Sequence, residues 1–169
     1  GTPSPPRLRS GMNAGHVDDP WLPARPGVRG GMRSHRLVLS PVIDDIPRLL
    51  DWAETCCGSA GVTIDVTGKM ALALEEAAAN VIHHAFPETP PPHRLEVTLA
   101  IDGERVVAEI VDNGRPFDPS TAAEADTTLP LEERDAGGLG IHLIRRMMDR
   151  VAYRRIDGEN RLLLEKARA

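Results

Sequence analysis

The chain contains few aromatic side chains, no long apolar run and no excess of positive charge. Two Trp, two Phe and one Tyr among 169 residues are too few for the stacking platforms that bind single-stranded nucleic acids. The net charge of −5 disfavours direct nucleic-acid binding and anionic membrane surfaces, because both reward excess Lys and Arg. No apolar run approaches the roughly 18 residues of a membrane-spanning helix, and no secretory signal follows the early arginines.

Cysteine is also scarce. The two cysteines, Cys56 and Cys57, are adjacent, a spacing that rarely permits a disulfide and that supplies too few ligands for a zinc site. Because reduced cysteines are typical of reducing compartments, we expect a cytoplasmic protein.

Composition divides the chain near residue 33. The first 31 residues hold six of the 15 prolines and six of the 15 glycines. This composition predicts a disordered arm over residues 1–33, part of which could derive from a cloning vector because it begins without Met. Residues 34–169 are predicted to form a single globular domain.

Hydrophobic periodicity and turn residues predict the elements of that domain. We expect a strand over 36–39, helices from Pro41 to about Ser59 and from about Asp65 to Phe86, and a hairpin of strands 94–101 and 105–112 around Asp102-Gly103. After a long polar loop, the spacing of four apolar residues predicts a helix that begins after the GGLG segment: Ile141, Ile144, Met148 and Val151. Two strands around Asp157-Gly158 end the chain. This order predicts an α/β two-layer sandwich, with a mostly antiparallel mixed sheet and helices on one face.

The second predicted helix has two different faces. Four apolar residues at helical spacing should face the core: Leu74, Ala78, Val81 and Ala85. Glu76, Asn80 and His84 fall on the opposite side, which taken alone is typical of a solvated face. An Asn carbonyl oxygen can also ligate Mg²⁺, and a Glu one turn earlier can accept a proton from an attacking hydroxyl.

The segment DNGRPFDP follows the predicted hairpin. Alternation along its second strand places Asp112 on the apolar face, where a carboxylate must find a hydrogen-bond donor. The exocyclic amine of adenine would meet that need, and Gly114 would let the chain turn beside the base. The alternative is an ordinary Asn-Gly turn after a strand.

The segment AGGLGIHLIRRMMDRV carries Gly137, Gly138 and Gly140 before a predicted helix. Free N–H groups and the helix dipole at such a position attract phosphate. The segment lacks the GK[ST] ending of a Walker A loop, and no strand directly precedes it as in a Rossmann fingerprint.

The three segments occur in the order of the Bergerat-type ATP-binding fold of gyrase, the Hsp90 chaperone, histidine kinases and MutL. Their amino-acid sequences resemble those of the anti-sigma-factor serine/threonine kinase family, and the resemblance extends over residues 34–167. The three segments read EEAAANVIHHAF, DNGRPFDP and GGLGIHLIRRMMDRVAYRR. The resemblance implies ATP and Mg²⁺ as cofactors. It implies Glu76 as general base, Asn80 as Mg²⁺ ligand and Asp112 as the acid that reads adenine. The other cofactor-binding positions that it implies are Gly114, Gly138 and Gly140.

Other positions keep open roles. Residues 115–136 match the family's ATP lid, in which Arg134 could reach a phosphate or be merely solvated. His84 matches a position that is often His in the family, with a structural role equally open. Glu75 competes with Glu76, but lies about 100° away around the helix axis. Pro116 stands where the family's DxGxG form has its second glycine, so the segment reads DxGxP, and only Asp112 and Gly114 are carried over as adenine contacts.

The resemblance implies that the protein phosphorylates a serine on an anti-anti-sigma protein. It would hold a sigma factor in one nucleotide state and release it in another, thereby controlling transcription, and relatives often dimerise. The alternative is an ATP-dependent partner-binding module without kinase activity. A detached histidine-kinase catalytic domain is a poor fit, because His83 and His84 lie inside the nucleotide-binding helix itself.

Overall fold

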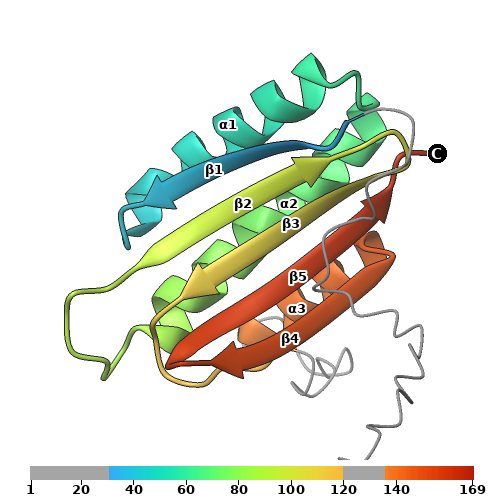
Figure 1. Cartoon of the computed structure of the whole chain (residues 1–169). Helices are drawn as coiled ribbons and strands as arrows, with labels where there is room; N and C mark the ends of the chain where they lie inside the picture. The colour runs from blue at the N-terminus through green and yellow to red at the C-terminus, as the bar shows by residue number, and fades with distance from the viewer. Residues whose placement is uncertain (1–30, 120–135) are drawn as a thin grey trace, which may run out of the picture.

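The computed structural model describes residues 31–119 and 136–169 (Figure 1). Nearly all of the predicted arm and most of the predicted lid, including Arg134, lie outside these residues. The described chain forms five strands and three α-helices: β1 (Arg33–Leu39), α1 (Ile46–Ser59), α2 (Ile64–Asn80), β2 (Leu95–Ile101), β3 (Arg105–Asp112), α3 (Ala136–Met147), β4 (Arg150–Ile156) and β5 (Glu159–Ala167). None of the described helices is long and apolar enough to cross a membrane.

The strands form one sheet in the order β1-β2-β3-β5-β4, and each neighbouring pair is antiparallel. The three α-helices lie together on one face of this sheet (Figure 1). The predicted two-layer α/β architecture is therefore confirmed, and the described strands pair antiparallel throughout.

The core lies between the sheet and the helices. On β3, Val106, Ala108 and Ile110 are buried and alternate with outward residues, as the period of two predicts. Leu74 and Ala78 of α2 are fully buried, so the predicted core face of this helix is confirmed. The short alanine side chains of α2 allow close packing, which places the helix beside the strand ends that carry the site.

The two predicted hairpin turns are present. At the first, Asp102 Oδ1 accepts hydrogen bonds from the backbone N–H groups of Glu104 (2.8 Å) and Arg105 (2.9 Å). At the second, Asp157 and Gly158 have φ angles of 52° and 80°. Two successive left-handed residues are what a two-residue hairpin with right-handed twist requires.

The first helix begins later than its sequence predicts. A 3₁₀ turn over Ile43–Asp45 precedes α1, which starts at Ile46 instead of Pro41. Asp45 explains the delay, because its Oδ2 atom accepts from the backbone N–H of Ser40 at 2.8 Å and holds the intervening residues in a turn. Pro47 then occupies the first turn of α1, where its missing N–H costs nothing.

The helix predicted to follow GGLG begins and ends earlier than its sequence predicts. Gly137, Gly138 and Gly140 lie within α3, and Val151 belongs to β4 instead of the helix. The helix ends early because Asp149 joins the sheet: its N–H donates to the Glu165 carbonyl at 2.9 Å.

The end of α2 is also irregular. Residues Val81–Ala85 form a π turn, in which the Phe86 N–H donates to the Val81 carbonyl five residues earlier. A widened turn of this kind is often found next to functional sites. It follows directly after Asn80.

Candidate nucleotide site

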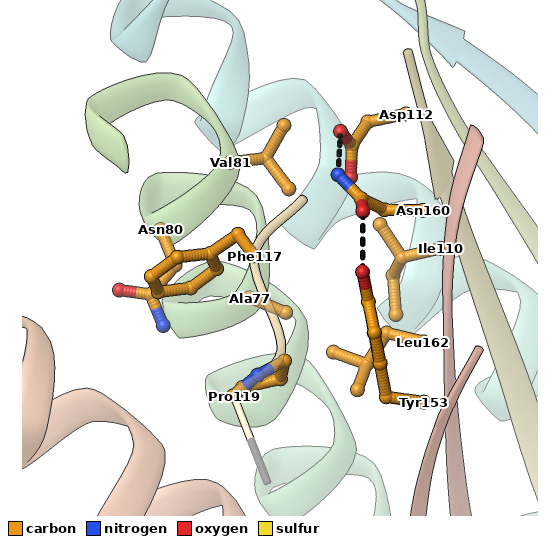
Figure 2. A pocket seen from close by; sticks show the side chains of 10 residues that line it. All are labelled: Ala77, Asn80, Val81, Ile110, Asp112, Phe117, Pro119, Tyr153, Asn160 and Leu162. Atoms are coloured by element: carbon orange, nitrogen blue, oxygen red, sulfur yellow. Dashed lines mark hydrogen bonds between the residues drawn. The ribbon is translucent and has the colours of Figure 1, made fainter. Parts of the chain in front are cut away.

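A pocket opens between α2 and the sheet, at the end of β3 (Figure 2). It encloses about 330 Å³, including space open to solvent. Its lining is mostly apolar with a few polar groups, which is typical of sites for small ligands. The lining residues are Ala77, Asn80, Val81, Ile110, Asp112, Phe117, Pro119, Tyr153, Asn160 and Leu162.

Asp112 lies at the end of β3 with only 3% of its surface exposed, on the apolar face as predicted. Its Oδ1 atom accepts two hydrogen bonds, from the Gly114 N–H at 2.9 Å and from Asn160 Nδ2 at 2.8 Å. Among the described residues none donates to Oδ2. Burial raises the pKa of Asp112, and the hydrogen bonds from Asn160 and Gly114 and the charge of Arg155 oppose this rise.

Asn80 lines the same pocket from the last turn of α2. It is 7% exposed, yet its Nδ2 atom has no hydrogen-bond partner among the described residues. A buried amide without a partner carries a desolvation penalty of about 1–3 kcal/mol, which a polar ligand would remove. The sequence alternative of a solvated face therefore does not hold for Asn80.

Glu76 lies one helical turn before Asn80 and is half-buried. Its Oε2 atom is so close to α3 that a Cβ atom on Gly140 would lie 2.4 Å from it. Burial raises the pKa of Glu76, and the neighbouring Glu75 carboxylate raises it further. Gly140 thus brings α3 against the carboxylate predicted to act as a base.

Gly114 packs against the end of the π turn. A Cβ atom there would lie 2.6 Å from the Ala85 carbonyl oxygen, and the Arg115 N–H donates to that same oxygen at 2.8 Å. His84 stacks on Phe117 with ring centroids 5.4 Å apart, which is a packing contact at the pocket rim. These contacts fasten the beginning of the predicted lid to the helix.

Sequence reasoning missed a further polar residue of the pocket, Asn160. It is 3% exposed at the start of β5 and pairs with Asp112 across the sheet. Its Oδ1 atom accepts from Tyr153 Oη at 2.6 Å (Figure 2) and also from Arg155 Nη1 at 2.9 Å. The signal was present, because Asn160 shares the buried alternation of Leu162 and Leu164 and so stands out as a polar residue on an apolar face.

The site residues suit a nucleotide with a divalent cation. Asp112 Oδ2, which has no donor among the described residues, can accept from an exocyclic amine. The amide of Asn80 carries a carbonyl oxygen of the kind that ligates Mg²⁺, and its Nδ2 atom, without a partner in the described part of the chain, can donate to a polar ligand. No group of three or more His, Cys, Asp or Glu side chains that could hold a metal occurs within the described part of the chain. Mg²⁺ often binds through one or two protein ligands together with substrate phosphates, so Asn80 alone is compatible with such a site.

Comparisons with known proteins agree with this arrangement. The chain is 35% identical over 96 residues to the serine/threonine-protein kinase BtrW of Bordetella bronchiseptica, covering 56% of this chain and 66% of the relative. It is 28% identical over 102 residues to the serine-protein kinase RsbW of Halalkalibacterium halodurans, covering 58% and 61%. The matches thus span less than two thirds of either relative.

The fold also matches a solved structure, the RsbU and RsbW domains of a Mycobacterium tuberculosis protein. That match has a TM-score of 0.56 at 12% identity and covers 81% of this chain and 33% of the other. The sequence profile of the histidine kinase-like ATPase domain matches residues 39–166, three quarters of the chain. The chain belongs to the histidine kinase-like ATPase domain family.

Proposed function

We propose that this protein binds Mg·ATP in the pocket and transfers the γ-phosphoryl group to a serine hydroxyl of a protein partner. One observation carries the proposal: Asp112 and Asn80 are buried polar residues that line the same pocket, and each has an atom without a hydrogen-bond partner among the described residues. The serine-protein kinases among the similar proteins support the same reaction class. Residues 34–169 form the proposed ATP-binding unit, and residues 1–33 an appended arm.

Each residue has a distinct role in this proposal. Asp112 accepts a hydrogen bond from the exocyclic amine of adenine through Oδ2, while the apolar side chains of the pocket cover the adenine ring. Asn80 would hold Mg²⁺ through its carbonyl oxygen, and the cation would supply positive charge to offset that of the phosphates. Gly138 and Gly140, in the first two turns of α3, would lie on the phosphate side, where the free N–H groups that open the helix favour anions.

Glu76 acts as the general base. It takes the proton from the serine hydroxyl as the serine oxygen forms a bond to the γ-phosphorus and the bond to the ADP oxygen breaks. Its raised pKa suits this task, because a base works best when its pKa approaches the working pH. In phosphoryl transfer the protein otherwise contributes mostly positioning and charge stabilisation.

The partners follow from the family resemblance. We propose that the acceptor serine belongs to an anti-anti-sigma protein and that the second partner is a sigma factor. A nucleotide can favour one of these two complexes only if its affinity differs between them. Exchange of partners in the cytoplasm would then control transcription by releasing or holding the sigma factor. Pull-downs from the native lysate with and without ATP should recover these two classes, and recovery of no partner under either condition would contradict partner switching.

Transfer of ³²P from γ-labelled ATP to the recovered acceptor tests the chemistry. Glu76→Gln should abolish transfer while leaving ATP binding intact, because the amide cannot accept the proton. Glu75→Gln is the matched control, since it removes the adjacent carboxylate from a different side of the helix, and transfer should persist at alkaline pH. Retained transfer in Glu76→Gln would remove Glu76 from its role. ATP binding by the wild type without any transfer would favour a partner-binding module without kinase activity.

A further inference from the structure

We propose that Asn160 is a positioning residue that keeps Asp112 a hydrogen-bond acceptor aimed into the pocket. Through this effect it would set the preference for a 6-amino purine over a 6-oxo purine nucleotide. The inference rests on the proposed ATP binding and deepens it, because it assigns base selectivity to the β4–β5 hairpin, an element that carries none of the sequence-predicted site residues.

The orientation of the Asn160 amide is fixed by its neighbours. The Arg155 guanidinium can only donate hydrogen bonds, so the atom that it contacts at 2.9 Å must be the carbonyl oxygen of Asn160. Tyr153 Oη contacts the same oxygen at 2.6 Å (Figure 2). The amide nitrogen must therefore face the opposite side, where it donates to Asp112 Oδ1 and to the Arg115 carbonyl, both at 2.8 Å.

This orientation determines what Asp112 can offer to a ligand. Asn160 and the Gly114 N–H both donate to Oδ1, so Oδ1 is occupied and Oδ2 is the atom left for the pocket. An ionised carboxylate can only accept, which suits the amine of a 6-amino purine. A 6-oxo purine would place its own acceptor against Oδ2, and two acceptors in a buried site leave both without a partner.

Loss of the Asn160 donor would change the chemistry of Asp112. Burial already raises the pKa of Asp112, while Asn160, Gly114 and the charge of Arg155 oppose the rise and Glu159 adds to it. Tyr153, on β4, is the other titratable side chain of the pocket, and the residues of α2 that line it are uncharged. Without Asn160 the carboxyl would bind a proton at a higher pH and could then donate to a 6-oxo group.

The same contacts connect the hairpin to the beginning of the predicted lid. Arg155 donates to the Gly114 carbonyl at 3.0 Å, and Asn160 donates to the Arg115 carbonyl. The hairpin thus holds both the side chain of Asp112 and the backbone that follows it. One buried amide has four partners, which makes its replacement a sharp test.

The test measures dissociation constants of the full-length chain for Mg·ATP and Mg·ITP by calorimetry, from pH 6 to 8.5. ITP differs from ATP in carrying an oxygen in place of the 6-amino group. The wild type should prefer ATP, and Asn160→Leu should reduce the ATP-to-ITP preference at least ~10-fold, equivalent to about 1.4 kcal/mol. As the pH is lowered, Asp112 binds a proton and ATP affinity falls. In the variant this fall should begin at a higher pH than in the wild type, a change that a purely structural role would not produce.

A second pair of variants covers the case in which Asn160→Leu does not fold. Arg155→Met removes one donor that orients the amide, and it should shift the nucleotide preference in the same direction by a smaller factor. Arg154→Met is its control, because Arg154 is the adjacent residue on the opposite face of β4, and its preference should equal that of the wild type. An unchanged ATP-to-ITP preference in Asn160→Leu, or in Arg155→Met where that variant alone folds, would overturn the inference. A wild type that binds neither nucleotide would instead overturn the proposed function together with it.

Discussion

Replacement of Gly114 by Ala probes the close approach of the chain after β3 to the end of the π turn. A Cβ atom at this position would lie 2.6 Å from the Ala85 carbonyl oxygen and 2.7 Å from Ala85 Cβ. Real Cβ atoms do not approach backbone so closely, so the chain must move. Gly114 is not among the glycines with positive φ, which are Gly61 and Gly158 in the described residues, so the effect is one of space alone.

The expected loss of stability follows from those contacts. Inserting a methyl group into a packed site costs about 1–3 kcal/mol. The displaced Ala85 carbonyl also accepts from the Arg115 N–H and from Thr89 Oγ1, and each such hydrogen bond contributes about 1 kcal/mol net. Together these terms lower the expected free energy of unfolding by about 3–5 kcal/mol, which corresponds to roughly 6–20 °C in Tm for a chain of this size.

Urea denaturation followed by circular dichroism measures this change. Gly68→Ala is the matched control, because Gly68 lies at an exposed position in the middle of α2. Apart from its chain neighbours and the backbone of its own helix, no described atom lies within 4 Å of the place that its new methyl group would take. That substitution should stabilise the protein by about 0.5–1 kcal/mol, since Ala is the better helix former. If the free energy of unfolding of Gly114→Ala lies within about 0.5 kcal/mol of the wild-type value, the close packing of Gly114 on Ala85 is not needed for stability and the reasoning fails.

Three further predictions concern the helix pair α2 and α3. Gly140→Ala should leave folding intact but reduce the rate of phosphoryl transfer at least ~10-fold, because the new methyl group displaces the Glu76 carboxylate; ATP affinity and kcat, measured separately, check this. Glu75→Gln should lower the pKa of Glu76, so the acid limb of the kcat–pH profile should move to lower pH, and an unmoved limb would exclude the coupling. Asn80→Ala should leave the free energy of unfolding within about 1 kcal/mol of the wild type, because the lost amide nitrogen has no partner among the described residues, while Mg·ATP binding should weaken strongly. Equal losses in the free energies of unfolding and of Mg·ATP binding would indicate a structural role.

Much of the fold could be predicted because local signals and tertiary packing agree. The Asp-Gly turns at 102–103 and 157–158 define two hairpins, and the apolar face of α2 is the one that the core buries. The placement of Asp112 on the apolar face also followed from simple alternation along β3. In each case a single short-range rule predicts the observed structure, because no distant contact acts against it.

The errors occurred where a distant contact overrides a local rule. Glycine normally marks a helix end, yet Gly140 lies inside α3, where its missing side chain makes room for Glu76 of another helix. The predicted start of α1 was wrong because the carboxylate of Asp45 accepts a hydrogen bond from the backbone N–H of Ser40. Such contacts depend on the assembled fold and leave no periodic trace in the sequence.

Asn160 marks the boundary between these two cases. Its position on the buried face of β5 was visible in the alternation, but its significance was not, because only the assembled sheet pairs it with Asp112. A buried Asn with four hydrogen-bond partners constrains its neighbours more strongly than an apolar residue, since any rotation leaves several groups unpaired. In the proposed nucleotide complex, the selectivity of the pocket would therefore depend as much on Asn160, which orients the carboxylate, as on Asp112, which would meet the base.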